Sequence, residues 1–201
     1  GSSVMTQHWI KAMWAGQSDA LRYDWISYSK MSPHVALAVL AAEDQRFPQH
    51  RGFDTEEIIA AIERRLDGGR LRGASTISQQ VARNLFLWQG RSFLRKGLEV
   101  WFTGLVEALW PKHRILEMYL NFAETGERMF GVAAASRYYF RVKPNRLSSQ
   151  QAALIAAVLP NPVLYRVDAP SAHVRQRRDW ILQQMQNLGG PAYLSGILDT
   201  P

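Results

Sequence analysis

Two glutamates, Glu43 and Glu99, each lie within a dense polar stretch of the chain, and their side chains could transfer protons. Glu43 directly follows an apolar run over residues 34–42, which is typical of a buried helix. A carboxyl group at the edge of an apolar surface is desolvated, which raises its pKa and suits it to act as a general base. The alternative is an exposed acid at a helix end that pairs with Arg46.

The second glutamate is surrounded by cations at helical spacing. Glu99 follows Arg95 by four residues and Arg91 by eight, so the three side chains share one face of a helix. Lys96 borders that face. One interpretation is a strip of cations that binds phosphate beside a single acid. The other is a solvated ion pair, which is worth about 0.3–0.5 kcal/mol.

A third polar stretch opens the helix that we predict after residue 74. Ser75 and Thr76 can cap this helix, whose free N–H groups and dipole attract anions. Gln79 and Gln80 add neutral hydrogen-bond donors, and Arg83 follows one turn later. These residues are either the anion-binding start of a helix or an ordinary helix cap.

Metal chemistry has weaker support in the sequence. The chain has no cysteine, which excludes disulfides and thiolate metal sites. His50 has no second histidine at metal-ligand spacing, so the pattern favours a structural hydrogen bond over a zinc site. Asp44 could join Glu43 at a divalent cation, although two adjacent acids are weak evidence.

The chain of 201 residues has an ordinary apolar content and is long enough for one folded domain, residues 1–201. Its net charge of +7 favours anionic partners such as phospholipid, nucleic acid or phosphorylated substrates, or simply good solubility. No apolar run reaches the ~20 residues that span a bilayer. Residues 1–3 (Gly-Ser-Ser) are typical of an expression-tag remnant, so a natural membrane anchor could have been removed.

Helix caps at Ser32, Asp54, Ser75 or Thr76, Ser148 and Ser171, together with prolines and apolar periodicity, predict a mostly α fold without strands or internal repeats. We expect helices at about residues 33–43, 55–67, 76–87, 93–109, 112–120, 131–140, 148–159 and 172–188. Residues 67–72 should form a mobile loop, and the tail from Pro191 should be loosely held. We interpret the cluster of Arg175, Arg177 and Arg178 as a solvated helix face, and attraction to phospholipid is the alternative.

Taken together, these stretches resemble the peptidoglycan glycosyltransferases, which are the transglycosylase domains of bifunctional penicillin-binding proteins and their monofunctional relatives. The resemblance runs in order from about residue 32 to 190. It rests on residues 43–52 (Glu-Asp-Gln-Arg-Phe-Pro-Gln-His-Arg-Gly), 73–84, 95–99 (Arg-Lys-Gly-Leu-Glu), 115–121 (Ile-Leu-Glu-Met-Tyr-Leu-Asn) and 131–140. The chain has no transpeptidase domain, which points to the monofunctional, proteobacterial type.

The resemblance implies a lysozyme-like, mostly α fold with a small second lobe, the jaw, near the membrane. Members of this family polymerise lipid II, a disaccharide-pentapeptide on undecaprenyl diphosphate. A single N-terminal helix anchors them in the inner membrane of a Gram-negative bacterium, with the catalytic domain in the periplasm. The implied partners are lipid II, the growing glycan strand, membrane phospholipid and other cell-wall synthesis or division proteins, with no nucleic acid and no organic cofactor.

The motifs also carry residue roles. Glu43 would deprotonate the GlcNAc 4-hydroxyl of the acceptor, and this oxygen would attack C1 of the donor MurNAc with inversion to form a β-1,4 link. Glu99 would orient the cations, or hold a metal ion or the donor; a cation such as Mg²⁺ would lie near Glu43, Asp44 or Glu99. The departing diphosphate would be held by Arg83, Arg91 and Lys96. The other substrate-binding candidates are Ser75, Thr76, Gln79, Gln80, Asn84, Arg95, Asp44, Phe47 and His50.

The chain departs from the family pattern at three positions. Arg83 replaces a common lysine, Leu98 stands where some relatives carry a cation, and Ala133 stands where an acid is common.

Three other classes of protein stay open. A lysozyme or lytic transglycosylase would share the fold but would not need the cations, since its leaving group is a sugar hydroxyl. The other two are an inactive membrane-associated scaffold and a nucleic-acid binder. The sequence has no aromatic-basic motif that would support nucleic-acid binding.

Overall fold

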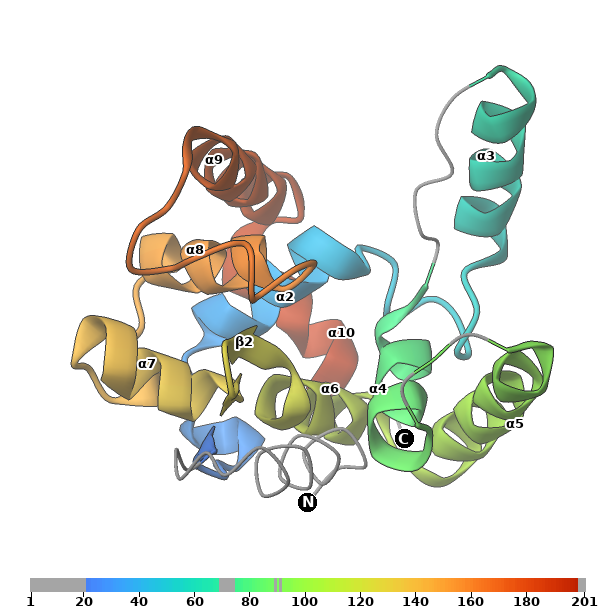
Figure 1. Cartoon of the computed structure of the whole chain (residues 1–201), viewed down its shortest axis with the longest axis horizontal. Helices are drawn as coiled ribbons and strands as arrows, with labels where there is room; N and C mark the ends of the chain where they lie inside the picture. Colours follow the sequence, from blue (N-terminus) through green and yellow to red (C-terminus); the bar gives the residue numbers. More distant parts are fainter. Residues whose placement is uncertain (1–20, 69–74, 89, 91, 199–201) are drawn as a thin grey trace.

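The computed structural model describes residues 21–68, 75–88, 90 and 92–198. Within these residues the fold is mostly α and lysozyme-like, as the sequence predicted (Figure 1). The helices are α2 (Pro33–Glu43), α3 (Thr55–Leu66), α4 (Ile77–Phe86), α5 (Phe93–Leu109), α6 (Lys112–Phe122), α7 (Val132–Phe140), α8 (Ser149–Val158), α9 (Ala172–Asn187) and α10 (Ser195–Leu198). Short 3₁₀ turns lie at Tyr28–Lys30, Pro144–Arg146 and Gly190–Leu194.

Helix α2 forms the centre of the molecule. It has no polar stripe, and every residue from 35 to 41 is buried, as expected of a helix that is apolar on all sides. Ser32 caps its first turn and also donates its hydroxyl hydrogen to the carbonyl of Leu147 at 2.8 Å. Pro33 follows at the first helical position, where its missing N–H costs nothing. Helix α2 packs against α8 and α9 (Figure 1).

The helices beside this centre begin at the predicted caps. Ser148 and Gln151 form a reciprocal capping box at the start of α8, and Thr76 and Gln79 form another at the start of α4. Ser171 caps α9. Helix α4 packs against α5 and α6, and α4 and α5 lie on the side of the molecule away from α7, with α6 between (Figure 1).

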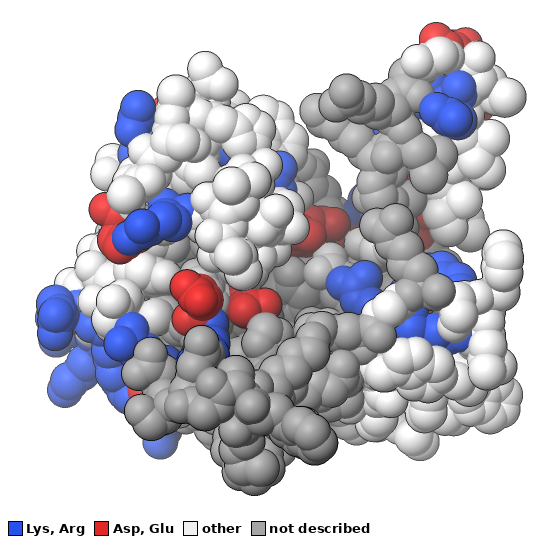
Figure 2. Space-filling view, viewed as in Figure 1, with Lys and Arg blue, Asp and Glu red and all other residues white. Residues whose placement is uncertain are grey.

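Helix α3 projects from the rest of the fold on the same side as α4 and α5 (Figure 1). The space-filling view shows a hollow between α3 and the body formed by α8 and α9, with acidic and basic residues at its base (Figure 2). Asp54 caps α3, as predicted. Most of the predicted loop over residues 67–72 lies outside the described residues, so its mobility stays a prediction.

The prediction of no strands was wrong. A small sheet has the order β1-β3-β2, where β1 (Arg22–Tyr23) runs parallel to β3 (Met129–Phe130) and β2 (Glu124–Gly126) runs antiparallel to it. Each strand is only two or three residues long, which is too short to show an alternating apolar pattern.

The prediction of a loosely held tail from Pro191 was also wrong up to residue 198. Leu194 and Ile197 are buried in the core. Tyr193 donates its hydroxyl hydrogen to the carbonyl of Gln45, two residues beyond the end of α2, at 2.6 Å. The segment is short, but its apolar side chains fill space beside α2, and that packing holds it.

Gly131 supplies a test of how tightly the sheet and α7 are joined. Its φ is +81°, and a Cβ there would lie 2.6 Å from the carbonyl oxygen of Asn121. We expect Gly131→Ala to lower the free energy of unfolding by about 2–3 kcal/mol, measured by urea denaturation. Gly104→Ala is the control, because a Cβ on that helical residue contacts nothing within 4 Å and should be neutral or slightly stabilising. Equal unfolding midpoints for the two variants would contradict this.

Candidate active site

Glu43 is the last residue of α2, and its carboxyl group is held from two sides. The side chain is 16% exposed. Nε2 of Gln80, on α4, donates to Glu43 Oε2 at 3.1 Å. Nη2 of Arg177, on α9, donates to Glu43 Oε1 at 3.3 Å. Among the described residues each carboxylate oxygen thus has one donor, which leaves a lone pair for another hydrogen.

Burial raises the pKa of Glu43 above the ordinary value for a glutamate. The nearby charge of Asp44 raises it further, while the hydrogen bond from Gln80 and the charges of Arg177 and Arg83 lower it. Desolvation is the largest of these effects. The carboxyl group can therefore take up a proton more readily than an exposed glutamate, as predicted from the apolar run before it.

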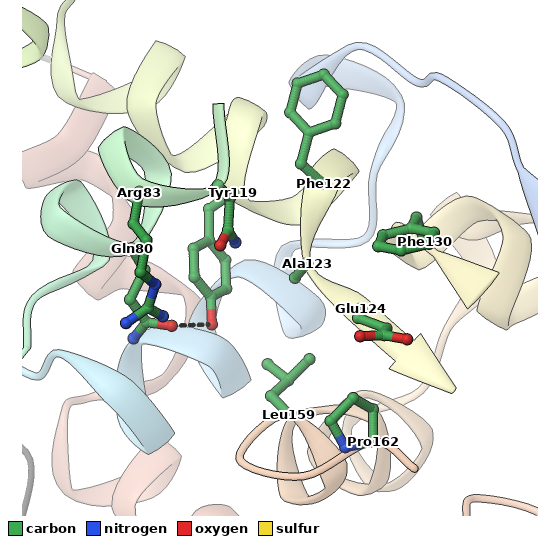
Figure 3. Close-up of a pocket in the computed structure, with 10 residues that line it drawn as sticks. Gln80, Arg83, Tyr119, Phe122, Ala123, Glu124, Phe130, Leu159 and Pro162 are labelled. Atoms are coloured by element: carbon green, nitrogen blue, oxygen red, sulfur yellow. Dashed lines mark hydrogen bonds between the residues drawn. The ribbon is translucent and has the colours of Figure 1, made fainter. Parts of the chain in front are cut away.

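Tyr119 orients the amide of Gln80. The Tyr119 hydroxyl, on α6, donates to Gln80 Oε1 at 3.3 Å (Figure 3). With its oxygen engaged there, the amide directs its NH₂ group to Glu43. The pKa of Tyr119 lies well above its ordinary value because the ring is fully buried, so the hydroxyl keeps its proton and stays a donor.

Asp44 joins three segments through its carboxylate, which is buried. Its Oδ1 contacts Nε2 of His50 at 2.9 Å, and its Oδ2 accepts a hydrogen bond from the backbone N–H of Ile77 at 2.9 Å. The second contact places a negative charge at the N-terminus of α4, where the helix dipole favours it. Asp44 and His50 therefore lie beside Glu43, but one Asp44 oxygen is engaged by His50 and the other by the start of α4.

Other candidates from the first two motifs also have partners within the fold. Thr76 donates its hydroxyl hydrogen to the carbonyl of Gly52 at 2.6 Å and shares the capping box with Gln79. Phe47 is fully buried, with Lys112 Nζ 4.5 Å from its ring centre. Ser75 precedes the Thr76 cap of α4 and is half-buried.

Glu99 lies in a separate cluster on α5. Its side chain is only 2% exposed, and Lys96 Nζ and Arg95 Nη1 approach its two oxygens at 2.6 and 3.5 Å. Lys96 itself is 53% exposed, whereas Arg95 is mostly buried and its Nε has no hydrogen-bond partner among the described residues. The predicted strip of cations around Glu99 is therefore present for these two residues. Arg91 lies outside the described residues.

A cavity of about 160 Å³ lies next to Gln80 and brings together three of the predicted residues (Figure 3). Gln80, Arg83 and Asn84 line it from α4. The remaining lining residues come from α6, the small sheet and the chain after α8; they are Tyr119, Phe122, Ala123, Glu124, Phe130, Leu159 and Pro162. Polar donors and a cation thus face an open space near the Glu43 carboxyl group.

Sequence reasoning missed two residues of this region. Arg177 was interpreted as part of a solvated face, which is wrong, since its side chain pairs with Glu43. A signal was available, because Arg177 falls between Val174 and Ile181 in the buried stripe of α9. Glu124 was not considered; its Oε1 is buried without a partner among the described residues, and burial raises its pKa.

The chain was compared with known proteins. The family model described as Transglycosylase matches residues 9–186. The chain belongs to the transglycosylase family. It is 52% identical over 193 residues to a biosynthetic peptidoglycan transglycosylase of Pseudomonas fluorescens, a match that covers 96% of this chain and 80% of the relative. A protein of the same name from Pseudomonas syringae pv. tomato is 50% identical over 197 residues, covering 98% and 84%.

As a transglycosylase, the protein is a peptidoglycan glycosyltransferase, which confirms the family that the motifs indicated. The names of these relatives specify biosynthesis. The cations around Glu99 and in the cavity agree with that reaction class, because glycosyl transfer from a diphosphate releases an anion.

The Asp44 contacts generate a stability test of this site. Asp44→Ala leaves the buried N–H of Ile77 and the His50 ring without their partner, which should cost about 3 kcal/mol of unfolding free energy in urea. Asp179→Ala is the control, because this exposed acid pairs with its neighbour Arg178 and should change stability by less than about 0.5 kcal/mol. If Asp44→Ala lost no more unfolding free energy than the control, the contacts of Asp44 with His50 and Ile77 would not stabilise the site.

Proposed function

We propose that the protein polymerises lipid II into β-1,4-linked glycan strands. Glu43 takes the proton of the acceptor 4-hydroxyl while this oxygen forms a bond to C1 of the donor sugar. The bond between C1 and the diphosphate oxygen breaks with inversion, and undecaprenyl diphosphate leaves with the electron pair. The observation that carries the proposal is the desolvated carboxyl group of Glu43, held by Gln80 and Arg177 and close to Arg83, the cation of α4.

The leaving diphosphate needs positive charge, and the structure supplies candidates for it. Arg83 lines the cavity near Glu43, and its guanidinium geometry suits phosphate oxygens. The Lys96 side chain is half-exposed and flexible, so its ammonium group can turn from Glu99 toward a substrate. In this proposal Glu99 orients Lys96 and Arg95, and Arg91 adds to the same group of cations.

A resident metal ion has little support in the described residues. No group of three His, Asp or Glu side chains among them could hold one. The oxygens of Asp44 and Glu99 already accept hydrogen bonds from His50, Ile77, Lys96 and Arg95. We therefore assign no step to a protein-bound metal, and propose that any Mg²⁺ would arrive with the substrate diphosphate.

Polymerisation of labelled lipid II in detergent tests the proposed reaction. We expect muramidase-sensitive polymer from the parent protein, and a 10²–10⁴-fold lower kcat from Glu43→Gln, roughly the share that a positioned base supplies. Glu127→Gln, which changes an exposed glutamate, is the control and should match the parent. If Glu43→Gln formed polymer as fast as the parent, the assignment of Glu43 as the base would be wrong. Release of soluble fragments from cell walls, without polymer, would contradict synthesis.

We also propose that the side built by α3 and α5 lies against the inner membrane and forms the jaw lobe. On α5, Leu94, Trp101 and Leu105 are exposed and share one helix face. Much of the α5 surface in view is uncharged (Figure 2). On α3, the exposed side chains of Ile59, Ile62 and Leu66 form a similar stripe. Exposed apolar stripes of this kind mark surfaces that meet lipid or another protein.

The described helices do not themselves provide an anchor, since none of them is long and apolar enough to cross a bilayer. A membrane-facing surface suits a substrate carried on a lipid, because the reacting sugars are then held near the headgroups. The proposal places the catalytic domain on the periplasmic side, with phospholipid, the growing strand and other cell-wall synthesis or division proteins as neighbours.

Vesicle binding tests the membrane surface. We expect the double variant Leu94→Ser and Trp101→Ser to bind vesicles containing phosphatidylglycerol at least about tenfold more weakly than the parent, because it removes two apolar side chains from the lipid contact. The matched control is Val163→Ser with Trp180→Ser, which changes two exposed apolar residues outside α3 and α5. Equal loss of binding in both double variants, or none in either, would contradict this orientation.

A further inference from the structure

Arg177 contacts the central carboxyl group of the site from a helix far away in the sequence. It lies 134 residues from Glu43, and α9 brings it there because Val174, Ile181 and Met185 on the same stripe are buried against the core. Its side chain is partly buried, and its Nε has no hydrogen-bond partner among the described residues. A guanidinium taken out of water with unused donors is costly, so its position calls for a physical reason.

We propose that Arg177 is a positioning residue for Glu43, which holds the carboxyl group in place and in its charged form. This inference rests on the proposed role of Glu43 as the base. A buried carboxyl group is a strong proton acceptor, but it can act only while it is deprotonated. The guanidinium opposes the desolvation of the carboxylate and so keeps enough of it ionised near neutral pH.

The geometry also fixes the direction of the carboxyl group. Gln80 donates to one oxygen from α4, and Arg177 donates to the other from α9. Two donors on opposite oxygens restrain rotation about the last side-chain bond, and each oxygen keeps a lone pair for the substrate hydroxyl. Without Arg177 the group would be less ionised and less well oriented.

Other groups around Glu43 set the background for this effect. Asp44 follows it on the chain and raises its pKa, whereas Arg83 on α4 lowers it. Tyr119 on α6 is neutral, since burial keeps its pKa well above the ordinary value. Tyr193, from the C-terminal 3₁₀ turn, has its pKa raised to about 12 and is neutral too. Helix α8 carries no titratable side chain. Of these groups, Arg177 is the cation with a direct bond to the Glu43 carboxylate.

The first test is the titration of Glu43 in the parent protein, Arg177→Met and Arg177→Lys. Its ¹³C-labelled side-chain carboxyl is followed by NMR and assigned with Glu43→Gln. Loss of the positive charge in Arg177→Met should move the titration midpoint to higher pH, whereas Arg177→Lys keeps a charge and should stay closer to the parent. Arg178→Met is the matched control, since Arg178 pairs with Asp179 on the surface. An unchanged midpoint in Arg177→Met would overturn the proposal.

The second test is the pH dependence of lipid II polymerisation by the same variants. In Arg177→Met, kcat at neutral pH should fall about tenfold, and the deficit should shrink as rising pH deprotonates Glu43. Partial recovery is expected for Arg177→Lys. A deficit independent of pH, or a rise in KM alone, would mean that Arg177 binds substrate instead and would overturn the proposal. If the Met variant fails to fold, Arg177→Gln and Arg177→Lys give the same comparison.

The two tests separate this inference from the proposed reaction. The titration needs no substrate, so it reports on the Arg177–Glu43 pair even if the parent protein forms no polymer. Failure of polymerisation in the parent would count against the proposed function alone. Normal polymerisation by the parent, together with the same Glu43 titration midpoint in the parent and in Arg177→Met, would count against this inference alone.

Discussion

The site depends on one constraint, which is that α2 has no polar face. A helix that is apolar on all sides has to be buried, and its one acidic residue can then be placed only at an end. Glu43 occupies the C-terminal end, where the negative helix dipole gives a carboxylate no support. The burial of α2 thus delivers a carboxyl group to the edge of the core with its hydration largely removed and its pKa raised.

The surrounding helices compensate for this lost hydration only in part. The Asp44 oxygens contact His50 and the backbone N–H at the start of α4, so this residue stabilises the fold. Glu99 is neutralised by two neighbouring cations on α5. Glu43 also receives one bond on each oxygen, from Gln80 and Arg177, but its burial outweighs them and raises its pKa, which makes it a ready proton acceptor. These different environments separate the roles of three acids that look similar in the sequence.

Local features of the chain were predictable because their physical causes are local. Capping residues indicated where four helices begin, at Ser32, Thr76, Ser148 and Ser171. The continuous apolar run of α2 indicated that this helix is buried. The strands were not predictable, because each is only two or three residues long and leaves no periodic pattern, and because β1 pairs with β3 from about a hundred residues away. The C-terminal tail was misjudged because its burial depends on space left beside α2.

Contacts within the site show the same division. The motifs identified Glu43, Gln80 and Arg83 because each lies in a recognisable polar stretch. The pairing of Arg177 with Glu43 depends on how α9 packs against α2, which no local pattern specifies, although an arginine within a buried stripe was a sign that it had a partner. The orienting contact of Tyr119 with Gln80 likewise needs the packing of α4 on α6.

The most direct test of the account is the pH dependence of kcat for lipid II polymerisation by the unaltered protein. If a desolvated Glu43 is the base, kcat should rise with pH through a single ionisation whose midpoint lies above the ordinary pKa of a glutamate, and the residual rate of Glu43→Gln should lack that rise. A midpoint at the value of an exposed glutamate, or a rise that survives in Glu43→Gln, would contradict the claim that burial of α2 creates the base.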